Sequence, residues 1–239
     1  MVMTMTHFLS DIASKAGFTL SDTQLEQFKT YADLLVEWNE KMNLTAITEP
    51  TEIATKHFVD SLYGLKFLAG KKKIIDVGTG AGFPGLPLKI AKPDIELTLL
   101  DSLNKRLTFL TEVKNQLGLD AVTCIHSRAE DGAKSGSLLR ESFDGAVSRA
   151  VANLSCLCEY CLPYVKRGGV FLAYKGPEVE EELASAQNAI ETLGGEVTGV
   201  FKYNIPETDI THSVVVITKI KSTPDKYPRL QGKIQKKPL

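Results

Sequence analysis

The 239-residue sequence predicts an α/β protein with a doubly wound, mostly parallel seven-stranded sheet and an N-terminal helical extension. From residue 71 onward, short apolar runs alternate with helix-length segments, which is typical of parallel strands joined by helical crossovers. A glycine-rich turn follows the first apolar run, as at the ligand-binding edge of such sheets. The last two runs are joined by a short polar loop at residues 206–209, which predicts an antiparallel pair at one edge.

The individual elements follow from apolar periodicity and turn residues. Residues 1–70 are expected to be helical, with one apolar face formed by Leu20, Leu25, Phe28, Tyr31, Leu34, Leu35 and Trp38. Ser21 and Gln24 have the spacing of a capping box. Strands are expected at residues 73–77, 95–101, 121–126, 143–148, 169–174, 196–204 and 212–220, and helices near 85–91, 103–117, 151–162 and 178–193. These elements divide the chain into a helical extension (1–70), a sheet domain (71–220) and a tail (221–239).

Composition narrows the classes of protein. A formal charge of −1 and 43% hydrophobic residues suit one large folded domain with an appendage. No run of about 18 apolar residues predicts a membrane span. The first residues lack a basic region followed by an apolar stretch, so we do not expect a secretion signal. Four cysteines without a secretory context favour reduced thiols. We therefore expect a cytoplasmic protein, and we expect it to act as a monomer.

Positive charge is concentrated at the C-terminus. Residues 219–239 hold seven basic side chains and one acid, a net charge of +6, so the remaining chain carries −7. A basic tail containing proline and glycine often becomes ordered on a polyanion such as RNA. A solvated, frayed terminus is the alternative.

The segment 74–85 is the strongest indication of a ligand site. Gly80-x-Gly82-x-x-Gly85 matches a dinucleotide fingerprint, and a nicotinamide-dependent oxidoreductase is therefore one hypothesis. Asp76, just before the turn, would repel a pyrophosphate. It favours a ligand that carries positive charge there, such as S-adenosylmethionine, and Gly78-x-Gly80-x-Gly82 after an acid is typical of enzymes that use it. Seven strands ending in an antiparallel pair suit the methyltransferase variant of the fold.

Two further segments are expected at the same edge of the sheet. Asp101 ends the second apolar run, where a carboxylate can hold ribose hydroxyls. Residues 127–130 follow the third strand and would lie beside an adenine. Glu130 could accept from the adenine amino group, or it could instead stabilise a helix N-terminus.

The end of the fourth strand, Ser148-Arg149-Ala150, bears on the chemistry. It offers neither the Asn or Asp with two prolines typical of amino-group methylation nor the thiolate that pyrimidine C5 chemistry needs. Cys124 lies on the third strand, which is the wrong one. A ring nitrogen with an exposed lone pair, such as guanine N7, remains, and its methylation needs no general base. We expect Arg149 to hold the substrate or the methionine carboxylate.

Two other patterns are weaker. Cys156-x-Cys158-x-x-Cys161 resembles a metal triplet, but it lies in an apolar helical stretch without a fourth ligand, so no metal is expected. His57 is either structural or a pH-sensitive ligand.

The chain resembles the RsmG (GidB) family across nearly its whole length. The motifs that carry the resemblance are Trp38-Asn39-x-Lys41-x-Asn43-Leu44-Thr45, His57-x-x-Asp60-Ser61, Asp76-x-Gly78-Thr79-Gly80-x-Gly82-Phe83-Pro84-Gly85, Asp101-Ser102-x-x-Lys105-Arg106, Arg128-Ala129-Glu130, Ser148-Arg149-Ala150 and Lys175-Gly176. The resemblance implies a bacterial cytoplasmic enzyme that methylates N7 of a guanine in the 530 loop of 16S rRNA, with S-adenosylmethionine as cofactor. The substrate would be 16S rRNA or the small ribosomal subunit.

Motifs and resemblance together give the expected site residues. Those expected to bind the cofactor are Asp76, Gly78, Gly80, Gly82, Phe83, Asp101, Ser102, Ala129, Glu130 and Arg149. The resemblance also implies that Lys105, Arg128 and Lys175 face the RNA or the site, so that with Arg149 they position substrate without a general base. A non-enzymatic RNA-binding assembly factor remains a further hypothesis.

Overall fold

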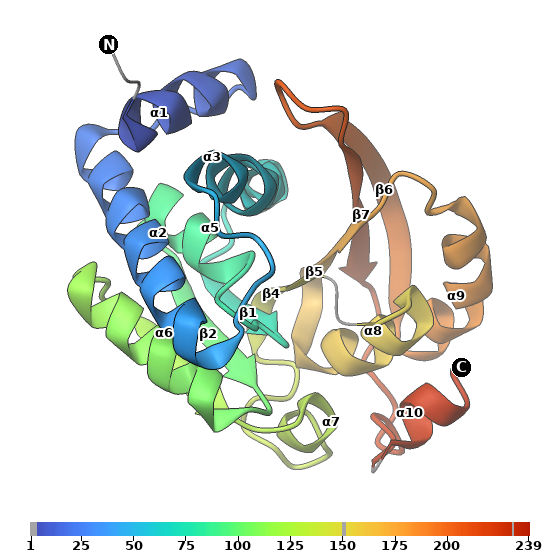
Figure 1. Ribbon diagram of the computed structural model, residues 1–239. Coiled ribbons are helices and arrows are strands. Elements are labelled where there is room, and N and C mark those ends of the chain that lie inside the picture. The colour runs from blue at the N-terminus through green and yellow to red at the C-terminus, as the bar shows by residue number, and fades with distance from the viewer. Residues whose placement is uncertain (1–3, 150–151, 231) are drawn as a thin grey trace.

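A computed structural model describes residues 4–149, 152–230 and 232–239. Its centre is a seven-stranded sheet in the order β3-β2-β1-β4-β5-β7-β6, with helices on both faces (Figure 1). Strands β1 to β5 run parallel, β7 is antiparallel to β5, and β6 is antiparallel to β7. The doubly wound, mostly parallel sheet and its antiparallel edge pair are confirmed.

The strands lie close to their expected positions. They are β1 (Lys73–Val77), β2 (Glu96–Asp101), β3 (Val122–His126), β4 (Phe143–Arg149), β5 (Val165–Lys175), β6 (Gly195–Asn204) and β7 (Thr211–Lys219). Strand β5 begins before its expected start at 169. Strand β5 pairs with β4 on both sides of Gly168 and Gly169, with a register shift at this point. Two consecutive glycines in a sequence usually indicate a turn, so the first part of the strand was not predicted.

The helices in the described residues are α1 (Met5–Lys15), α2 (Asp22–Met42), α3 (Pro50–Glu52), α4 (Asp60–Leu62), α5 (Gly85–Ala91), α6 (Asn104–Gln116), α7 (Ala129–Gly132), α8 (Leu154–Cys161), α9 (Glu180–Thr192) and α10 (Lys233–Lys236). A π-helical segment, Ile53–Val59, joins α3 to α4. Helix α8 begins at Leu154, where Asn153 Oδ1 accepts from Cys156 N at 3.0 Å; residue 151, its expected start, lies outside the described residues. The sequence did not predict the short helix α10, and it anticipated α7 only through the alternative that Glu130 stabilises a helix N-terminus.

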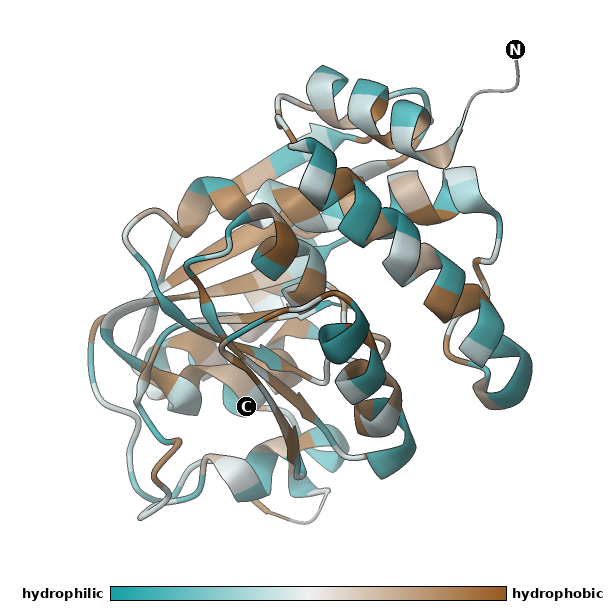
Figure 2. Cartoon of the chain, turned by 90° about the vertical axis from the view of Figure 1, so that its left-hand side faces the viewer, coloured by the Kyte–Doolittle hydropathy of each residue, from teal (hydrophilic) through white to brown (hydrophobic). Residues whose placement is uncertain are grey.

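Each face of the sheet has its own hydrophobic core. Alternate strand residues point to opposite faces, so Ile74 and Leu172 pack with α2, α5 and α6, while Ile75 and Ala173 pack with α8 and α9. Figure 2 shows hydrophobic residues along the strands and mixed colouring on the surrounding helices. Both faces being covered leaves the carboxyl edge of the parallel strands free to form a site.

The N-terminal helices share the core of the first face. The expected capping box is present: Ser21 N donates to Gln24 Oε1 at 2.8 Å, and Gln24 N donates to Ser21 Oγ at 3.3 Å. Gln24 also donates to Ile90 O at 2.9 Å, and the Tyr31 hydroxyl donates to the carbonyl of Ala81 in the glycine turn. Helix α2 therefore holds the turn in place from behind. Within the described residues, no helix is long and apolar enough to cross a membrane.

Candidate functional site

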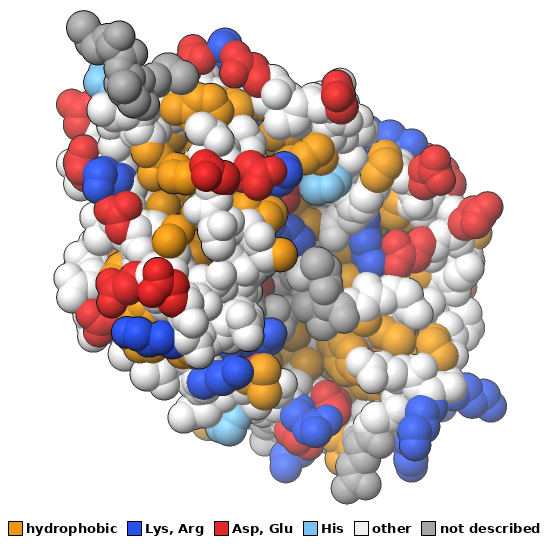
Figure 3. All heavy atoms as spheres, in the orientation of Figure 1, with side chains coloured by type: hydrophobic (Ala, Val, Ile, Leu, Met, Phe, Trp, Pro, Cys, Tyr) orange, Lys and Arg blue, Asp and Glu red, His pale blue; other side chains and the backbone are white. Residues whose placement is uncertain are grey.

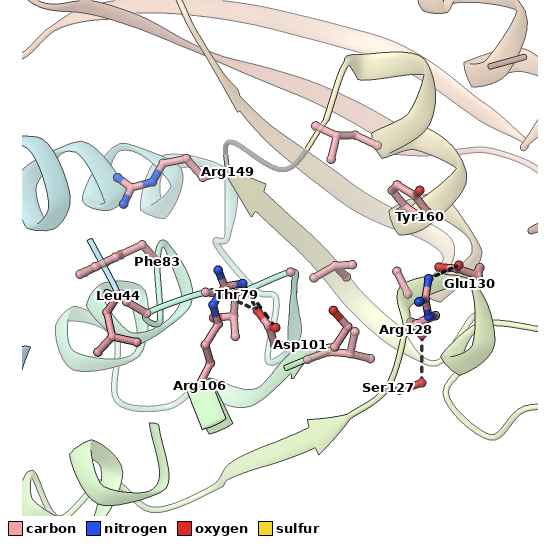
Figure 4. Close-up of a pocket in the computed structure, with 18 of the residues that line it drawn as sticks. Leu44, Thr79, Phe83, Asp101, Arg106, Ser127, Arg128, Glu130, Arg149 and Tyr160 are labelled. Atoms are coloured by element: carbon pink, nitrogen blue, oxygen red, sulfur yellow. Dashed lines mark hydrogen bonds and ion pairs between the residues drawn. The ribbon is translucent and has the colours of Figure 1, made fainter. Parts of the chain in front are cut away.

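A pocket of about 520 Å³ lies at the carboxyl ends of β1, β2, β3 and β4 (Figure 4). Its volume is in the range of small-molecule sites and suits a nucleoside-sized ligand. Nine of the expected site residues line it: Gly78, Gly80, Phe83, Asp101, Ser102, Arg128, Ala129, Glu130 and Arg149. Strand β4 supplies Arg149, while Ala150 of the same motif lies outside the described residues.

The glycine turn presents backbone to the pocket. Gly78 and Gly80 have φ values of 71° and 60°, a conformation that favours glycine. Gly82, in contrast, does not line the pocket. A Cβ on Gly82 would lie 2.5 Å from the Tyr31 hydroxyl, so this glycine permits close packing of the turn on α2.

Asp76 also lies outside the pocket lining, although the sequence argument placed it against the ligand. It is fully buried beneath the turn, where its Oδ2 accepts from Thr79 Oγ1 and Gly85 N, both at 2.8 Å. The same carboxylate explains Gly85, since a Cβ there would lie 2.7 Å from Asp76 Oδ2. Burial raises the pKa of Asp76 to about 7, and Oδ1 has no hydrogen-bond partner among the described residues. Asp76 thus shapes the turn from below.

Asp101 lies at the middle of the pocket (Figure 4). Its side chain is 2% exposed, and it accepts from Gly80 N and Leu103 N, each at 2.9 Å. Arg106 Nη1 approaches Asp101 Oδ2 at a looser 3.3 Å. A carboxylate has about four acceptor sites, so capacity remains for a ribose hydroxyl.

One end of the pocket is formed by α7 and α8. Glu130 is 6% exposed and faces Tyr160, whose pKa burial and the nearby Glu130 raise to about 12. Arg128 Nη1 lies 3.9 Å from Glu130 Oε1, with its side chain mostly in solvent. This end combines a buried acceptor with an aromatic ring, which fits a nucleobase.

Arg149 forms the opposite end. Its Nη1 donates to Asp60 Oδ2 at 2.6 Å and to the carbonyl of Lys56 at 3.1 Å, and its guanidinium lies 5.1 Å from the ring centroid of Phe83. Its Nη2 donates to His57 Nδ1 at 3.2 Å. The sequence linked Arg149, Asp60, His57 and Phe83 only through the motifs of the family resemblance. It did not predict the contacts among them.

Asp60 is the buried centre of this cluster. It is 1% exposed, and its Oδ1 accepts from the Tyr203 hydroxyl and from His212 Nδ1, both at 2.8 Å. Burial alone would raise the pKa of Asp60, but the hydrogen bond from His212 and the charge of Arg149 lower it below its ordinary value. Asp60 is therefore an ionised carboxylate with all its partners in place.

His57 is neutral. Burial and the positive charge of Arg149 lower the pKa of His57 to about 3. Because Nδ1 accepts from Arg149, Nε2 carries the proton and donates to Thr45 Oγ1 at 2.9 Å. The ring stacks on Phe83 with 4.3 Å between centroids. His57 therefore does not change charge near neutral pH, and it contributes to the site through hydrogen bonds and stacking.

A second pocket of about 550 Å³ adjoins the first, and Arg149 and His57 line both. Lys175 lines the second pocket, where its Nζ donates to Glu182 Oε1 at 2.6 Å and to Ala152 O at 2.8 Å. Lys105 is exposed on α6 and lines neither pocket. The structure thus brings Arg149 and Lys175 together and leaves Lys105 on the surface.

Sequence reasoning missed His212 and Tyr203 in the second pocket region. A signal was available for His212. Strand β7 runs antiparallel to β5, so its first residues must lie beside the carboxyl end of β5, as the pairing of Ser213 with Lys175 shows. Tyr160 was missed because an apolar helix gives no sign of which face meets a ligand.

Within the described part of the chain, no group of three or more His, Cys, Asp or Glu side chains could hold a metal ion. Cys156, Cys158 and Cys161 are free thiols buried in α8. Burial raises the pKa of Cys158 above its ordinary value, so it is an unreactive core side chain.

The sheet order and the pocket at its carboxyl edge define a class I, S-adenosylmethionine-dependent methyltransferase. A model of the family "rRNA small subunit methyltransferase G" (GidB) matches residues 24–211, and the chain belongs to this family. It is 54% identical over 235 residues to ribosomal RNA small subunit methyltransferase G of Clostridium perfringens (strain 13 / Type A), covering 96% of this chain and 98% of the relative. Identity to the protein of the same name from Alkaliphilus metalliredigens is 53% over 233 residues, with 97% of each chain covered. Because the chain belongs to this methyltransferase family, the hypothesis of a nicotinamide-dependent oxidoreductase is excluded.

Solved structures are similar in fold. The structure of P. horikoshii TYW2 in complex with MeSAdo aligns with a TM-score of 0.55 at 13% identity, covering 70% of this chain and 63% of that one. The 16S rRNA (adenine(1408)-N(1))-methyltransferase from Catenulisporales acidiphilia aligns with a TM-score of 0.52 at 15% identity, covering 69% and 93%. At these identities the likeness supports the architecture alone.

Proposed function

We propose that this protein transfers a methyl group from S-adenosylmethionine to N7 of a guanine in the 530 loop of 16S rRNA. The observation that carries the proposal is the pair of adjoining pockets that share Arg149 and His57. The first is sized for the cofactor, and the second, of about 550 Å³, is large enough for a base turned out of an RNA strand.

The junction of the pockets sets the orientation of the cofactor. Its methyl-bearing sulfur must face the second pocket, so the methionine half lies toward Arg149 and Phe83. Asp101, at the middle, is placed to accept from the ribose hydroxyls. The adenine then lies at the opposite end, between Glu130 and Tyr160. Gly78 and Gly80 allow the ligand to approach the backbone closely.

When bound, S-adenosylmethionine supplies an electrophilic methyl group on a positively charged sulfur. Guanine N7 has an in-plane lone pair, so its attack releases no proton and requires no general base. The chain's contribution is then to position the base, with Arg149 fixed by Asp60 at 2.6 Å and His57 held neutral against it. Amino-group methylation would need a proton acceptor in contact with the base, but Asp60 is 1% exposed and is enclosed by Arg149, Tyr203 and His212.

The parts of the chain divide this work. Residues 71–220 form most of the cofactor pocket, and the extension 1–70 adds Leu44, Thr45 and His57 to it. The extension also supplies Lys56, His57 and Asp60 to the second pocket, which would take the base. The basic tail, 221–239, and Arg128 would contact RNA phosphates. Figure 3 shows Lys and Arg side chains gathered over α10. The proposal includes a monomer that acts in the cytoplasm, where ribosomes are assembled.

The test combines cofactor titration with methyl transfer. Calorimetry should show binding of S-adenosylmethionine and no binding of NAD. With small subunits from cells lacking this gene, the purified protein should transfer labelled methyl that appears as 7-methylguanosine after nuclease digestion and mass spectrometry. Naked 16S rRNA in parallel reveals which form is the substrate. A labelled exocyclic amine or C5-methylpyrimidine contradicts the proposal, and cofactor binding without any transfer favours an assembly role instead.

A further inference from the structure

The C-terminal segment reaches the cofactor pocket. Gly232 and Gln235 line it, although they lie more than 130 residues beyond the glycine turn in sequence. The sequence indicated only two roles for the tail, binding a polyanion or fraying in solvent, and assigned it no place in the pocket. In the structure the chain continues from β7 to α10, which contacts α8 (Figure 1).

An ion pair between Arg229 and the buried Glu159 holds the C-terminal segment against α8. Glu159 of α8 is fully buried, and its two oxygens accept from Arg229 Nε at 2.9 Å and from Arg229 Nη2 at 2.6 Å. The backbone N of Arg229 donates to the same carboxylate at 2.7 Å, and its Nη1 reaches the carbonyl of Lys237 at 2.9 Å. A bidentate pair with additional hydrogen bonds is a strong and directional anchor. It joins the segment on both sides of α10 to the helix that carries Leu157 and Tyr160 to the pocket.

The chain before Arg229 is held as well. Arg140 donates to the carbonyls of Thr223 at 2.6 Å and Tyr227 at 2.8 Å, and Thr223 N donates to Glu141 Oε1 at 2.7 Å. In α10, Ile234 is 1% exposed and packs in the core of the second face. The chain is therefore anchored both before and after α10, and this holds the next residue, Gln235, at the wall of the pocket.

Gln235 has free hydrogen-bonding capacity. Its side chain makes no hydrogen bond to another described residue, and it is exposed on the pocket wall. A carboxamide offers two donors and an acceptor, which matches the mixed donor and acceptor edge of an adenine. Helix α10 packs against α8, where the thiol of Cys156 donates to the carbonyl of Ile234 at 3.5 Å. Gln235 therefore lies at the same end as Tyr160 and Glu130.

We propose that the C-terminal segment completes the cofactor site, with Gln235 binding the adenosine end of S-adenosylmethionine and the Arg229–Glu159 pair holding Gln235 in place. This inference rests on the cofactor orientation given under the proposed function. It makes the tail part of the cofactor pocket in addition to any contact with RNA.

The test measures binding of two ligands by calorimetry: S-adenosylmethionine and 5′-methylthioadenosine, which lacks the amino-acid half. Gln235→Ala should raise the Kd of both by a similar factor, about five- to tenfold for a lost hydrogen bond. Arg229→Ala should raise both at least as much, because the whole segment loses its anchor. Lys236→Ala, an exposed neighbour on the same helix that does not line the pocket, is the matched control and should change neither.

A second readout needs no substitution. Saturating S-adenosylmethionine should slow tryptic cleavage after Lys233 in the unaltered protein, because the ligand holds α10 on the body. Thermal unfolding identifies any variant that has lost its fold. Gln235→Ala changes an exposed side chain and should fold normally, so its binding result tests the inference even if Arg229→Ala does not fold.

Unchanged affinity for both ligands in Gln235→Ala would overturn the inference. A loss for S-adenosylmethionine alone would also overturn it, since it would place Gln235 at the methionine half. If the unaltered protein binds neither ligand, the proposed function itself fails, and this outcome is distinct from the first two.

Discussion

Replacing Arg149 by alanine should destabilise the protein as well as impair methyl transfer. Asp60 is 1% exposed and loses the donor that lies 2.6 Å from its Oδ2. Breaking a buried ion pair by removing one partner typically costs ~3–5 kcal/mol, because an uncompensated charge is left behind. Asp60 keeps its hydrogen bonds from Tyr203 and His212, so we expect a loss near the lower limit, about 3 kcal/mol.

Urea denaturation of the single and double variants separates the two effects. Asp60→Asn in the Arg149→Ala background removes the orphaned charge and should recover about 2 kcal/mol of unfolding free energy. It should recover no methyl transfer, since the positioning side chain is still absent. Arg167→Ala, an exposed arginine of β5, is the control and should stay within about 0.5 kcal/mol of the unaltered protein.

Two results would refute this reasoning. A cost below about 1 kcal/mol for Arg149→Ala would show that Asp60 is not a desolvated charge dependent on this arginine. A double variant that is less stable than Arg149→Ala alone would show that the two side chains do not stabilise each other as a pair.

Three further predictions concern the cofactor, the turn and the tail. Asp101→Ala should weaken S-adenosylmethionine binding by about 1–3 kcal/mol in calorimetry, because ribose hydroxyls lose their acceptor; unchanged affinity contradicts the assignment. The pKa of Asp76 is raised to about 7 in the folded state, so its contribution to stability is present below pH 4 and is lost as the pH rises to 7. Stability of Asp76→Asn relative to the unaltered protein should therefore increase over this window, by at most ~4 kcal/mol, and a constant difference contradicts the burial argument. Replacing Lys233, Lys236 and Lys237 together by glutamine should lower the log–log salt slope of RNA binding by about two; an identical slope means that these lysines do not contact phosphates.

The glycine turn and the acid after β2 were predictable because they are local. A strand, a glycine-rich turn and a helix follow one another within residues 73–91, and the expected helix 85–91 coincides with α5. The direction of Asp76 was not predictable in the same way. A carboxylate at a strand end can face the ligand or the turn, and only the close packing of Gly85 against it selects the turn.

The remaining features of the site depend on contacts between segments that are distant in the sequence, and these contacts were not predictable. Asp60, Tyr203 and His212 come from the extension and the edge strands, and no local pattern links them. The pairing of Arg229 with Glu159 likewise spans 70 residues. Charge content alone predicted a polyanion-binding or frayed tail, since it carries no information about the buried Ile234 beside the exposed lysines. Deleting the tail would therefore disturb the pocket and the core.

The most direct test of the central claim is to map the modified nucleotide in the cell. 16S rRNA from cells with and without this gene is treated with borohydride and aniline, which cleave the chain at 7-methylguanosine, and the cleavage site is read by primer extension. We predict a cleavage in the 530 loop that disappears when the gene is deleted and returns with the unaltered gene, but not with the Arg149→Ala variant. Cleavage that persists without the gene, or a methyl group lost from another atom or another loop, would contradict the account.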